Sequence, residues 1–133
     1  MKIAIIGTGN LGLSIAKGLL ISDKITSLFL TKNKTSTIKD YNEIDNVFVT
    51  NDNIKAVTES DIIIVSVQPS DAVNIFKSIK DKIKENHIII STITGLKIFE
   101  IEKIIGADKK IIRSMPNTAI SIRKSLTCIC SNN

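Results

Sequence analysis

Cysteine, histidine and tryptophan are scarce in this sequence. Its 133 residues include two cysteines, one histidine and no tryptophan. A disulfide framework and a Cys/His metal site both need more of these residues at characteristic spacings, so we expect neither, and no metal is predicted. Long apolar runs are also absent: a bilayer-crossing helix needs about 20 consecutive apolar residues, and the first run here stops at Gly7, too early for a signal peptide. We therefore expect no membrane association and a cytoplasmic location.

Aromatic residues are few as well, at 4% of the chain against 43% hydrophobic residues in total. The core should therefore consist of aliphatic side chains, chiefly isoleucine, which is typical of a parallel sheet covered on both faces. A chain of 133 residues can form one domain with a real core but is too short for two. We predict a single domain over residues 1–133.

Positive charge is carried almost entirely by lysine. The formal net charge is +5, and only Arg113 and Arg123 are arginines. The lysines are scattered along the chain and do not form a basic stripe interleaved with aromatic residues. We therefore expect no nucleic-acid partner.

A glycine motif follows the first apolar run. Residues 3–6 have the character of a strand, glycines follow in Gly-x-Gly-x-x-Gly spacing, and apolar residues then continue with helical spacing to residue 20. In a dinucleotide site the first glycine permits a tight turn, the second lets pyrophosphate approach the backbone, and the third lets helix and strand pack closely. The helix N-terminus attracts phosphate through its unpaired N–H groups and its dipole. The pattern predicts a dinucleotide site, with a plain strand-to-helix turn as the alternative. Its candidate residues are Ile6, Gly7, Thr8, Gly9, Asn10, Leu11 and Gly12.

The segment after the second predicted strand, residues 26–31, indicates which dinucleotide binds. An NAD site carries Asp or Glu about 20 residues beyond the glycines to bond the ribose 2′-hydroxyl. No acidic residue occurs between Thr26 and Lys39, and two lysines stand where an adenosine 2′-phosphate would lie. The sequence therefore favours NADP over NAD, with a solvated lysine loop as the alternative. The candidate contacts are Thr31, Lys32, Asn33 and Lys34.

Strands and helices alternate along the rest of the chain. We predict further strands at residues 47–50, 61–67, 87–91, 110–113 and 125–130, and helices ending near residue 60 and spanning 70–84 and 97–105. This alternation predicts an α/β fold, a doubly wound parallel sheet of the Rossmann type with right-handed crossovers. Ligands bind beyond the carboxyl ends of such strands. The loops at 7–12, 31–34, 66–69, 92–95 and 114–118 should therefore share one edge of the sheet.

The predicted strands and helices also lead to predictions for individual side chains. His87 begins a strand, so we interpret it as structural. Cys128 and Cys130 lie two residues apart in a predicted strand and share one of its faces, where we expect buried thiols. The helix at 70–84 should have one apolar side, made of Val73, Phe76, Ile79 and Ile83.

Five short motifs together resemble the pyrroline-5-carboxylate reductase family over essentially the whole chain. They are IGTGNLG at 6–12, Asn53, Ser-Val-Gln-Pro at 66–69, Gly95, and Met-Pro-Asn-Thr at 115–118, which is the most specific. The chain departs from the family at Gln68, where lysine is usual, at Thr94, where alanine is common, and at Ala119, where proline normally follows. The resemblance implies further cofactor contacts at Asn53, Ser66, Val67, Gln68, Pro69, Ile93, Thr94 and Gly95, and places Asn117 near the nicotinamide and the substrate.

The resemblance also implies an activity, the NADPH-dependent reduction of pyrroline-5-carboxylate to L-proline. Hydride would pass from the nicotinamide to the C=N carbon of this imino acid, and the protein would orient the cofactor. No residue has the pattern of a general acid or nucleophile, so no catalytic residue is assigned.

Family members continue for about as many residues again, as a helical domain that forms the dimer and supplies much of the imino-acid pocket. The resemblance therefore implies a cofactor domain truncated before a helical dimerisation domain, and a homo-oligomer when full-length. Two alternatives remain open: the corresponding domain of a deazaflavin (F420)-type NADP oxidoreductase, and a stand-alone NADP-binding module without catalysis.

Overall fold

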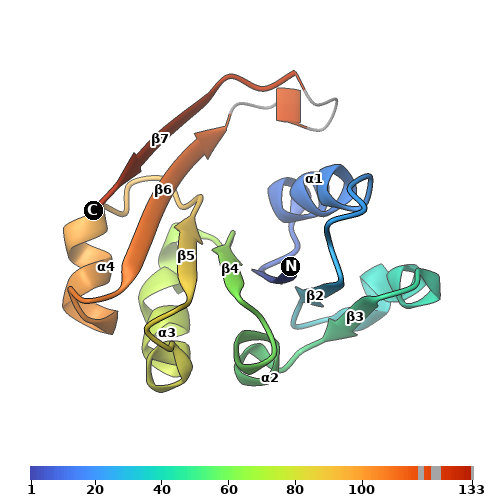
Figure 1. Ribbon diagram of the computed structural model, residues 1–133, viewed down its shortest axis with the longest axis horizontal. Coiled ribbons are helices and arrows are strands. Elements are labelled where there is room, and N and C mark those ends of the chain that lie inside the picture. Colours follow the sequence, from blue (N-terminus) through green and yellow to red (C-terminus); the bar gives the residue numbers. More distant parts are fainter. Residues whose placement is uncertain (117–118, 121–123, 133) are drawn as a thin grey trace.

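A seven-stranded sheet in the order β3-β2-β1-β4-β5-β6-β7 forms the centre of the molecule (Figure 1). The computed structural model describes residues 1–116, 119–120 and 124–132. Strands β1 to β6 run parallel to their neighbours, and β7 runs antiparallel to β6. The strands are Lys2–Ile6 (β1), Ser27–Thr31 (β2), Val47–Thr50 (β3), Ile62–Val65 (β4), Ile88–Ser91 (β5), Lys110–Pro116 (β6) and Thr127–Ser131 (β7).

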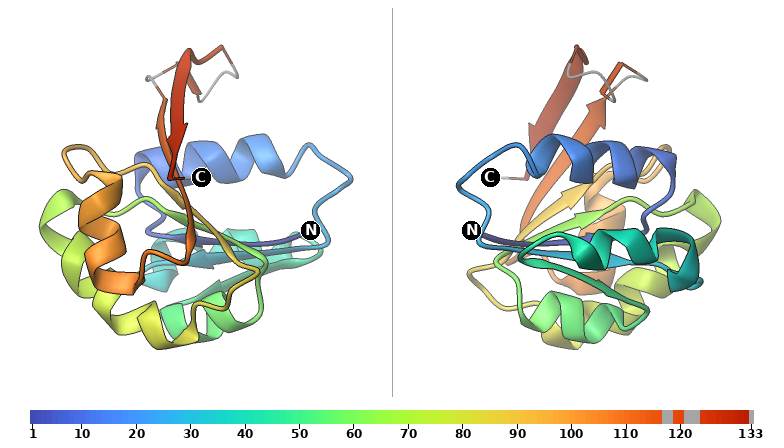
Figure 2. Two further views of the ribbon diagram at one scale, coloured as in Figure 1. Left: turned by 60° about the vertical axis from the view of Figure 1, so that its left-hand side comes forward. Right: turned by 90° about the vertical axis from the view of Figure 1, so that its right-hand side faces the viewer.

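Helices cover the sheet on both faces, as Figure 2 shows. The α-helices are Asn10–Leu19 (α1), Asn53–Thr58 (α2), Pro69–Ile79 (α3) and Ile98–Ile105 (α4), and the 3-10 segments are Thr35–Glu43 (η1) and Lys80–Lys82 (η2). Side chains of α2, α3 and α4 share one buried cluster, whereas α1 and η1 contribute to a separate cluster on the other face. The prediction of a doubly wound α/β sheet is therefore confirmed.

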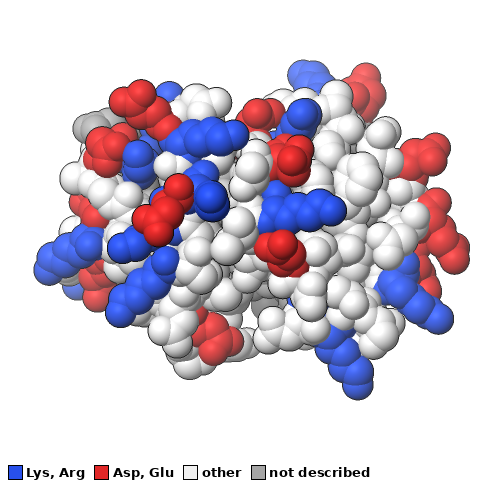
Figure 3. Space-filling model, turned by 90° about the horizontal axis from the view of Figure 1, so that it is seen from below, with Lys and Arg blue, Asp and Glu red and all other residues white. Residues whose placement is uncertain are grey.

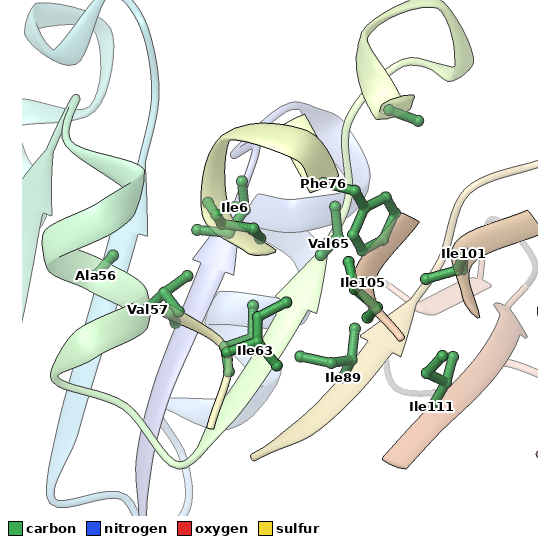
Figure 4. Close-up of a cluster of buried hydrophobic side chains, with 14 of the residues drawn as sticks. Ile6, Ala56, Val57, Ile63, Val65, Phe76, Ile89, Ile101, Ile105 and Ile111 are labelled. Carbon is green, nitrogen blue, oxygen red and sulfur yellow. The ribbon is translucent and has the colours of Figure 1, made fainter. Parts of the chain in front are cut away.

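The larger cluster lies between the sheet and α2, α3 and α4 (Figure 4). Its strand residues include Ile63, Ile89 and Ile111, which point toward Phe76 of α3 and Ile101 of α4. Successive side chains of a strand face opposite layers, so the continuous apolar runs of β1 and β4 supply both clusters. Each fully buried isoleucine contributes roughly 1.5–3 kcal/mol to folding, which explains how a chain so poor in aromatic residues forms its core.

Helix α3 is shorter than predicted and buries a different residue. It ends at Ile79 and continues as the single turn η2, not as a helix to residue 84. Val73 is 41% exposed, whereas Ala72 is buried. The positions 72, 76, 79 and 83 follow the helical repeat, while residue 73 lies about 90° from the centre of that stripe. A small residue at 72 also lets the helix lie close to the sheet.

The segment at 35–43 folds into η1, which the polar sequence did not predict. Ile38 of η1 is buried against the smaller cluster. Asn42 of η1 accepts a hydrogen bond through Oδ1 from the backbone N–H of Val49, at 3.0 Å. Because β3 is an edge strand, this side chain satisfies a backbone donor that a second chain could otherwise pair with.

Strand β7 differs most from the sequence prediction. It is antiparallel, because the connection at 117–126 is shorter than the dozen or more residues that a parallel crossover requires. All five of its residues are exposed, including Cys128 and Cys130, so the prediction of buried thiols is wrong. Figure 2 shows the β6–β7 ribbon rising away from the body of the domain. The boundaries shift too: the strand predicted at 110–113 extends to Pro116, and Ser114 lies inside it, not in a loop.

Asn132 secures the far end of β7. Its Oδ1 accepts from the backbone N–H of Ile111 at 2.9 Å, and its Nδ2 donates to the carbonyl of Lys109 at 2.8 Å and to Glu102 at 3.0 Å. These bonds join the end of the ribbon to β6 and α4.

His87 is structural, as its position before β5 indicated. Its side chain is 1% exposed, and Nδ1 accepts a hydrogen bond from the backbone N–H of Lys84. Burial lowers the pKa of His87 below its usual value, and the charge of Lys84 acts in the same direction. Burial therefore favours the neutral imidazole, whose Nδ1 holds the turn before β5.

The exposed charges are mixed in sign. In the face that Figure 3 shows, basic and acidic side chains are interspersed, and the described residues there form no continuous basic stripe. Of the helices in the described part of the chain, none is long and apolar enough to cross a bilayer.

Candidate functional site

A cleft of about 520 Å³ opens at the carboxyl ends of β1, β2 and β4. Twelve of the predicted cofactor contacts line it, together with three residues of α3 that the sequence analysis did not select. The predicted residues are Ile6, Gly7, Thr8, Gly9, Thr31, Lys32, Asn33, Lys34, Asn53, Ser66, Val67 and Gln68; the additional ones are Asp71, Asn74 and Ile75.

Each glycine of the loop after β1 meets a different environment. Gly7 has φ +89°, and a Cβ there would lie 2.7 Å from the carbonyl oxygen of Ser66. A Cβ on Gly12 would overlap the carbonyl oxygen of Gly7, so helix and loop pack backbone against backbone. A Cβ on Gly9 would meet no atom within 4 Å. Gly7 and Gly12 are therefore required by the fold, whereas the space in front of Gly9 belongs to the cleft.

Thr8 and Thr31 join the ends of β1 and β2. The backbone N–H and Oγ1 of Thr8 both donate to the carbonyl oxygen of Thr31, at 3.1 and 3.0 Å. The Oγ1 of Thr31 accepts in turn from the backbone N–H of Gly7 at 3.3 Å. Both threonines are buried, so their side chains hold the loop in place.

Helix α1 begins immediately after this loop with Gly9 as its N-cap, and no side chain caps it. The first N–H groups of a helix have no partner within the helix, and with the helix dipole they attract an anion. The open space at Gly9 lies beside these groups. The loop therefore fits a pyrophosphate group.

The loop after β2 forms the basic wall of the cleft. Lys32 is partly buried, and Asn33 and Lys34 are exposed. The backbone N–H of Lys32 donates to Thr50 at 3.1 Å, which extends the pairing of β2 with β3 and fixes the start of the loop. Neither lysine is engaged in an ion pair with any residue that the structure describes. Both ammonium groups can therefore bind an anionic ligand.

Asn53 enters the cleft from the first position of α2. Asp52, the N-cap of this helix, accepts a hydrogen bond from the backbone N–H of Lys55 at 3.0 Å through Oδ1. The cap sets where α2 begins, so it also sets the position of Asn53.

Seven predicted contacts do not line this cleft. Ile93 is 1% exposed, with its side chain in the larger buried cluster, and Thr92 ties the loop after β5 to the carbonyl of Val65 at 3.2 Å. Asn117, predicted to lie near the substrate, is outside the described residues. The contacts that the cleft does not include are Asn10, Leu11, Gly12, Pro69, Ile93, Thr94 and Gly95, and their roles stay predictions.

A spacing pattern in the sequence could have identified the three additional cleft residues of α3. Positions 71, 74 and 75 follow Gln68 at intervals of three, six and seven, so one face of the helix continues the cleft-lining turn. The spacing of apolar residues, by contrast, points only to the side of this helix that faces the core. In the described residues, no group of three or more His, Cys, Asp or Glu side chains is arranged to hold a metal ion.

Residues 2–95 match the family model described as NADP oxidoreductase, coenzyme F420-dependent. The chain belongs to this family. All of the residues that line the cleft lie within this matched range.

Within this NADP oxidoreductase family, the chain is similar to pyrroline-5-carboxylate reductases. It is 42% identical over 129 residues to pyrroline-5-carboxylate reductase 1 of Dictyostelium discoideum, covering 96% of this chain and 23% of that protein. It is 37% identical over 134 residues to pyrroline-5-carboxylate reductase 2 of the same organism, covering 98% and 45%. The chain spans about half or less of the length of these curated relatives.

Solved structures agree with this similarity. A pyrroline-5-carboxylate reductase from Coxiella burnetii superimposes with a TM-score of 0.92 at 27% identity, over 99% of this chain and 50% of that one. The Plasmodium falciparum pyrroline carboxylate reductase with NADP bound has a TM-score of 0.85 at 25% identity, over 100% and 48%.

Proposed function

We propose that this chain is the cofactor domain of an enzyme that reduces pyrroline-5-carboxylate to L-proline with NADPH. The observation that carries the proposal is the similarity to curated pyrroline-5-carboxylate reductases over 96–98% of the chain. The cleft of the NADP oxidoreductase domain supports it, because its glycine loop fits a pyrophosphate and its basic wall fits a 2′-phosphate.

The chain's own residues bind and orient the cofactor in this proposal. When bound, NADPH supplies the hydride that reduces the C=N carbon of the imino acid. The backbone at 9–11 holds the pyrophosphate, Lys32 and Lys34 hold the 2′-phosphate, and Asn53 contacts the adjoining ribose. The turn at 66–69 borders the adenosine, and the loop at 93–95 together with Asn117 borders the nicotinamide. These roles are assigned by position and by the resemblance to the family.

The domain organisation is part of the same proposal. Residues 1–133 form the dinucleotide-binding domain, and a following helical domain completes the imino-acid pocket and the homo-oligomer. The chain matches about half of Dictyostelium reductase 2 and of the two solved reductases, and less of Dictyostelium reductase 1, which supports this division. We place the enzyme in the cytoplasm.

We expect the 133-residue chain to bind NADPH but to reduce pyrroline-5-carboxylate at least about 100-fold more slowly than the full-length gene product. Positioning of the reactants lowers a barrier by ~7–11 kcal/mol, and loss of roughly 3 kcal/mol already slows a reaction about 100-fold. The measurement is NADPH oxidation with pyrroline-5-carboxylate, with Dictyostelium reductase 2 as positive control. Turnover by the short chain at the full-length rate would contradict the missing-pocket argument. An inactive full-length protein would overturn the proposed substrate.

The family description favours one second candidate, hydride transfer between NADP and a deazaflavin. The relatives that match nearly the whole chain favour the imino acid instead. Replacing pyrroline-5-carboxylate by oxidised F420 in the same assay separates the two, because only the true acceptor supports NADPH oxidation. A stand-alone binding module would support neither reaction even at full length.

We further expect NADPH to bind about tenfold more tightly than NADH, and the double variant Lys32→Asp/Lys34→Asp to reverse this order. A well-made charge-assisted bond contributes about 1.5–3 kcal/mol, and exposure reduces it toward the value of a surface pair. Titration calorimetry with both cofactors measures the ratio. The control, Lys80→Asp/Lys82→Asp in η2, carries the same charge change away from the cleft and should keep the parent ratio. Equal affinities in the parent chain would show that the lysine loop is only solvated.

A further inference from the structure

Helix α3 presents two different faces. Ala72, Phe76 and Ile79 are buried in the larger core cluster. Asp71 lies on the flank of this buried face and Asn74 on the opposite side of the helix, and both line the cleft. Because packing of the apolar face fixes the helix, the polar face is held in a defined position before any ligand arrives.

The walls of the cleft differ in charge. The loop after β2 contributes Lys32 and Lys34, whereas Asp71 is the only carboxylate among the described residues that line the cleft. A phosphate group is therefore repelled from the α3 wall and attracted to the lysines and to the glycine loop. The uncharged base of the nucleotide is the part that suits the α3 wall, where Val67 and Ile75 offer apolar surface to a flat ring.

We propose that Asp71, assisted by Asn74, makes this site selective for adenine by accepting a hydrogen bond from the 6-amino group. The inference rests on the proposed binding of NADP. An ionised carboxylate only accepts hydrogen bonds, and adenine presents a donor at position 6. Hypoxanthine carries a carbonyl oxygen there, so two acceptors would face each other. The amide of Asn74 has both a donor and an acceptor and can bond a ring nitrogen beside the amino group.

The carboxylate of Asp71 is available for this role. It is exposed, and it takes part in no ion pair or side-chain hydrogen bond with the described residues. The backbone N–H of Asp71 donates to the carbonyl of Gln68 at 3.0 Å, which fixes the residue in the first turn of α3. An acidic residue there also stabilises the helix through its dipole, so the test must separate recognition of the base from stability.

The experiment is titration calorimetry of NADPH and of its hypoxanthine analogue, reduced nicotinamide hypoxanthine dinucleotide phosphate. We expect the parent chain to bind NADPH about tenfold more tightly than the analogue. Asp71→Asn should abolish or invert this ratio, because an amide can donate to the carbonyl oxygen of hypoxanthine. Removing the negative charge changes the affinity for both dinucleotides alike, so this effect cancels in the ratio.

The matched control is Asp81→Asn, the same change on an exposed residue of η2, and it should retain the parent ratio. Thermal unfolding of both variants measures any loss of helix stability. Equal affinities of the parent for the two dinucleotides, or an unchanged ratio in Asp71→Asn, would overturn the inference while leaving the proposed function intact. Failure of the parent to bind either dinucleotide would overturn both.

Discussion

Gly9→Val should weaken NADPH binding at least about 100-fold and lower the free energy of unfolding by no more than about 1 kcal/mol, the cost of a poorer N-cap residue. The valine side chain would project into the cleft, because a Cβ on Gly9 meets no protein atom within 4 Å. Gly9 has φ −75°, a value that valine also adopts, so the folded backbone is not strained. A bound pyrophosphate would lose its close approach to the N–H groups at the start of α1. Two charge-assisted bonds of about 1.5–3 kcal/mol each are then lost or weakened.

Titration calorimetry with NADPH and thermal unfolding, run on the same preparations, measure the two effects. Gly18→Val is the matched control, because Gly18 lies at the other end of α1 and a Cβ there also meets nothing within 4 Å. It should bind NADPH like the parent. Unchanged affinity in Gly9→Val would refute the assignment of the pyrophosphate to this loop, and a large loss of stability would refute the description of Gly9 as open to the cleft.

Gly12→Ala should act mainly on folding, in contrast to Gly9→Val. We expect it to lower the free energy of unfolding by about 2–3 kcal/mol. The added methyl group would overlap the carbonyl oxygen of Gly7, and that oxygen has little room to move. The Gly7 backbone is held by a hydrogen bond to Thr31 and lies against Ser66. The substitution therefore weakens the packing of α1 against β1, which holds the glycine loop in place. Thermal unfolding should show a decrease in Tm of roughly 10 °C.

Gly18→Ala is the control for this substitution. It makes the same chemical change in the same helix without a clash, so its higher helix propensity should raise stability by up to about 1 kcal/mol. If Gly12→Ala were as stable as the parent, the close contact between α1 and the loop after β1 would be wrong. Together, the substitutions at Gly9 and Gly12 separate ligand binding from folding within one motif.

The sequence by itself determined the features that depend on neighbours along the chain. The glycine loop, the order of strands and α-helices as far as β6, and the grouping of the loops at 7–9, 31–34 and 66–68 all follow from local patterns. Apolar runs of four or five residues predict buried strands because side chains on both faces must be covered, and parallel strands bring their carboxyl ends to one edge.

Only the tertiary structure decided the features that depend on contacts between distant segments. The sequence of β7 cannot reveal that none of the described helices covers this strand. The exposure of Cys128 and Cys130 therefore became evident only from the place of β7 at the edge of the sheet. Ile93 belongs to a predicted loop, yet its side chain lies in the core because the bond from Thr92 to Val65 draws the loop against β4. Asp71 looks like any acidic residue in the first turn of a helix. It becomes a cleft residue because burial of Ala72 and Phe76 turns that side of α3 toward the lysines after β2.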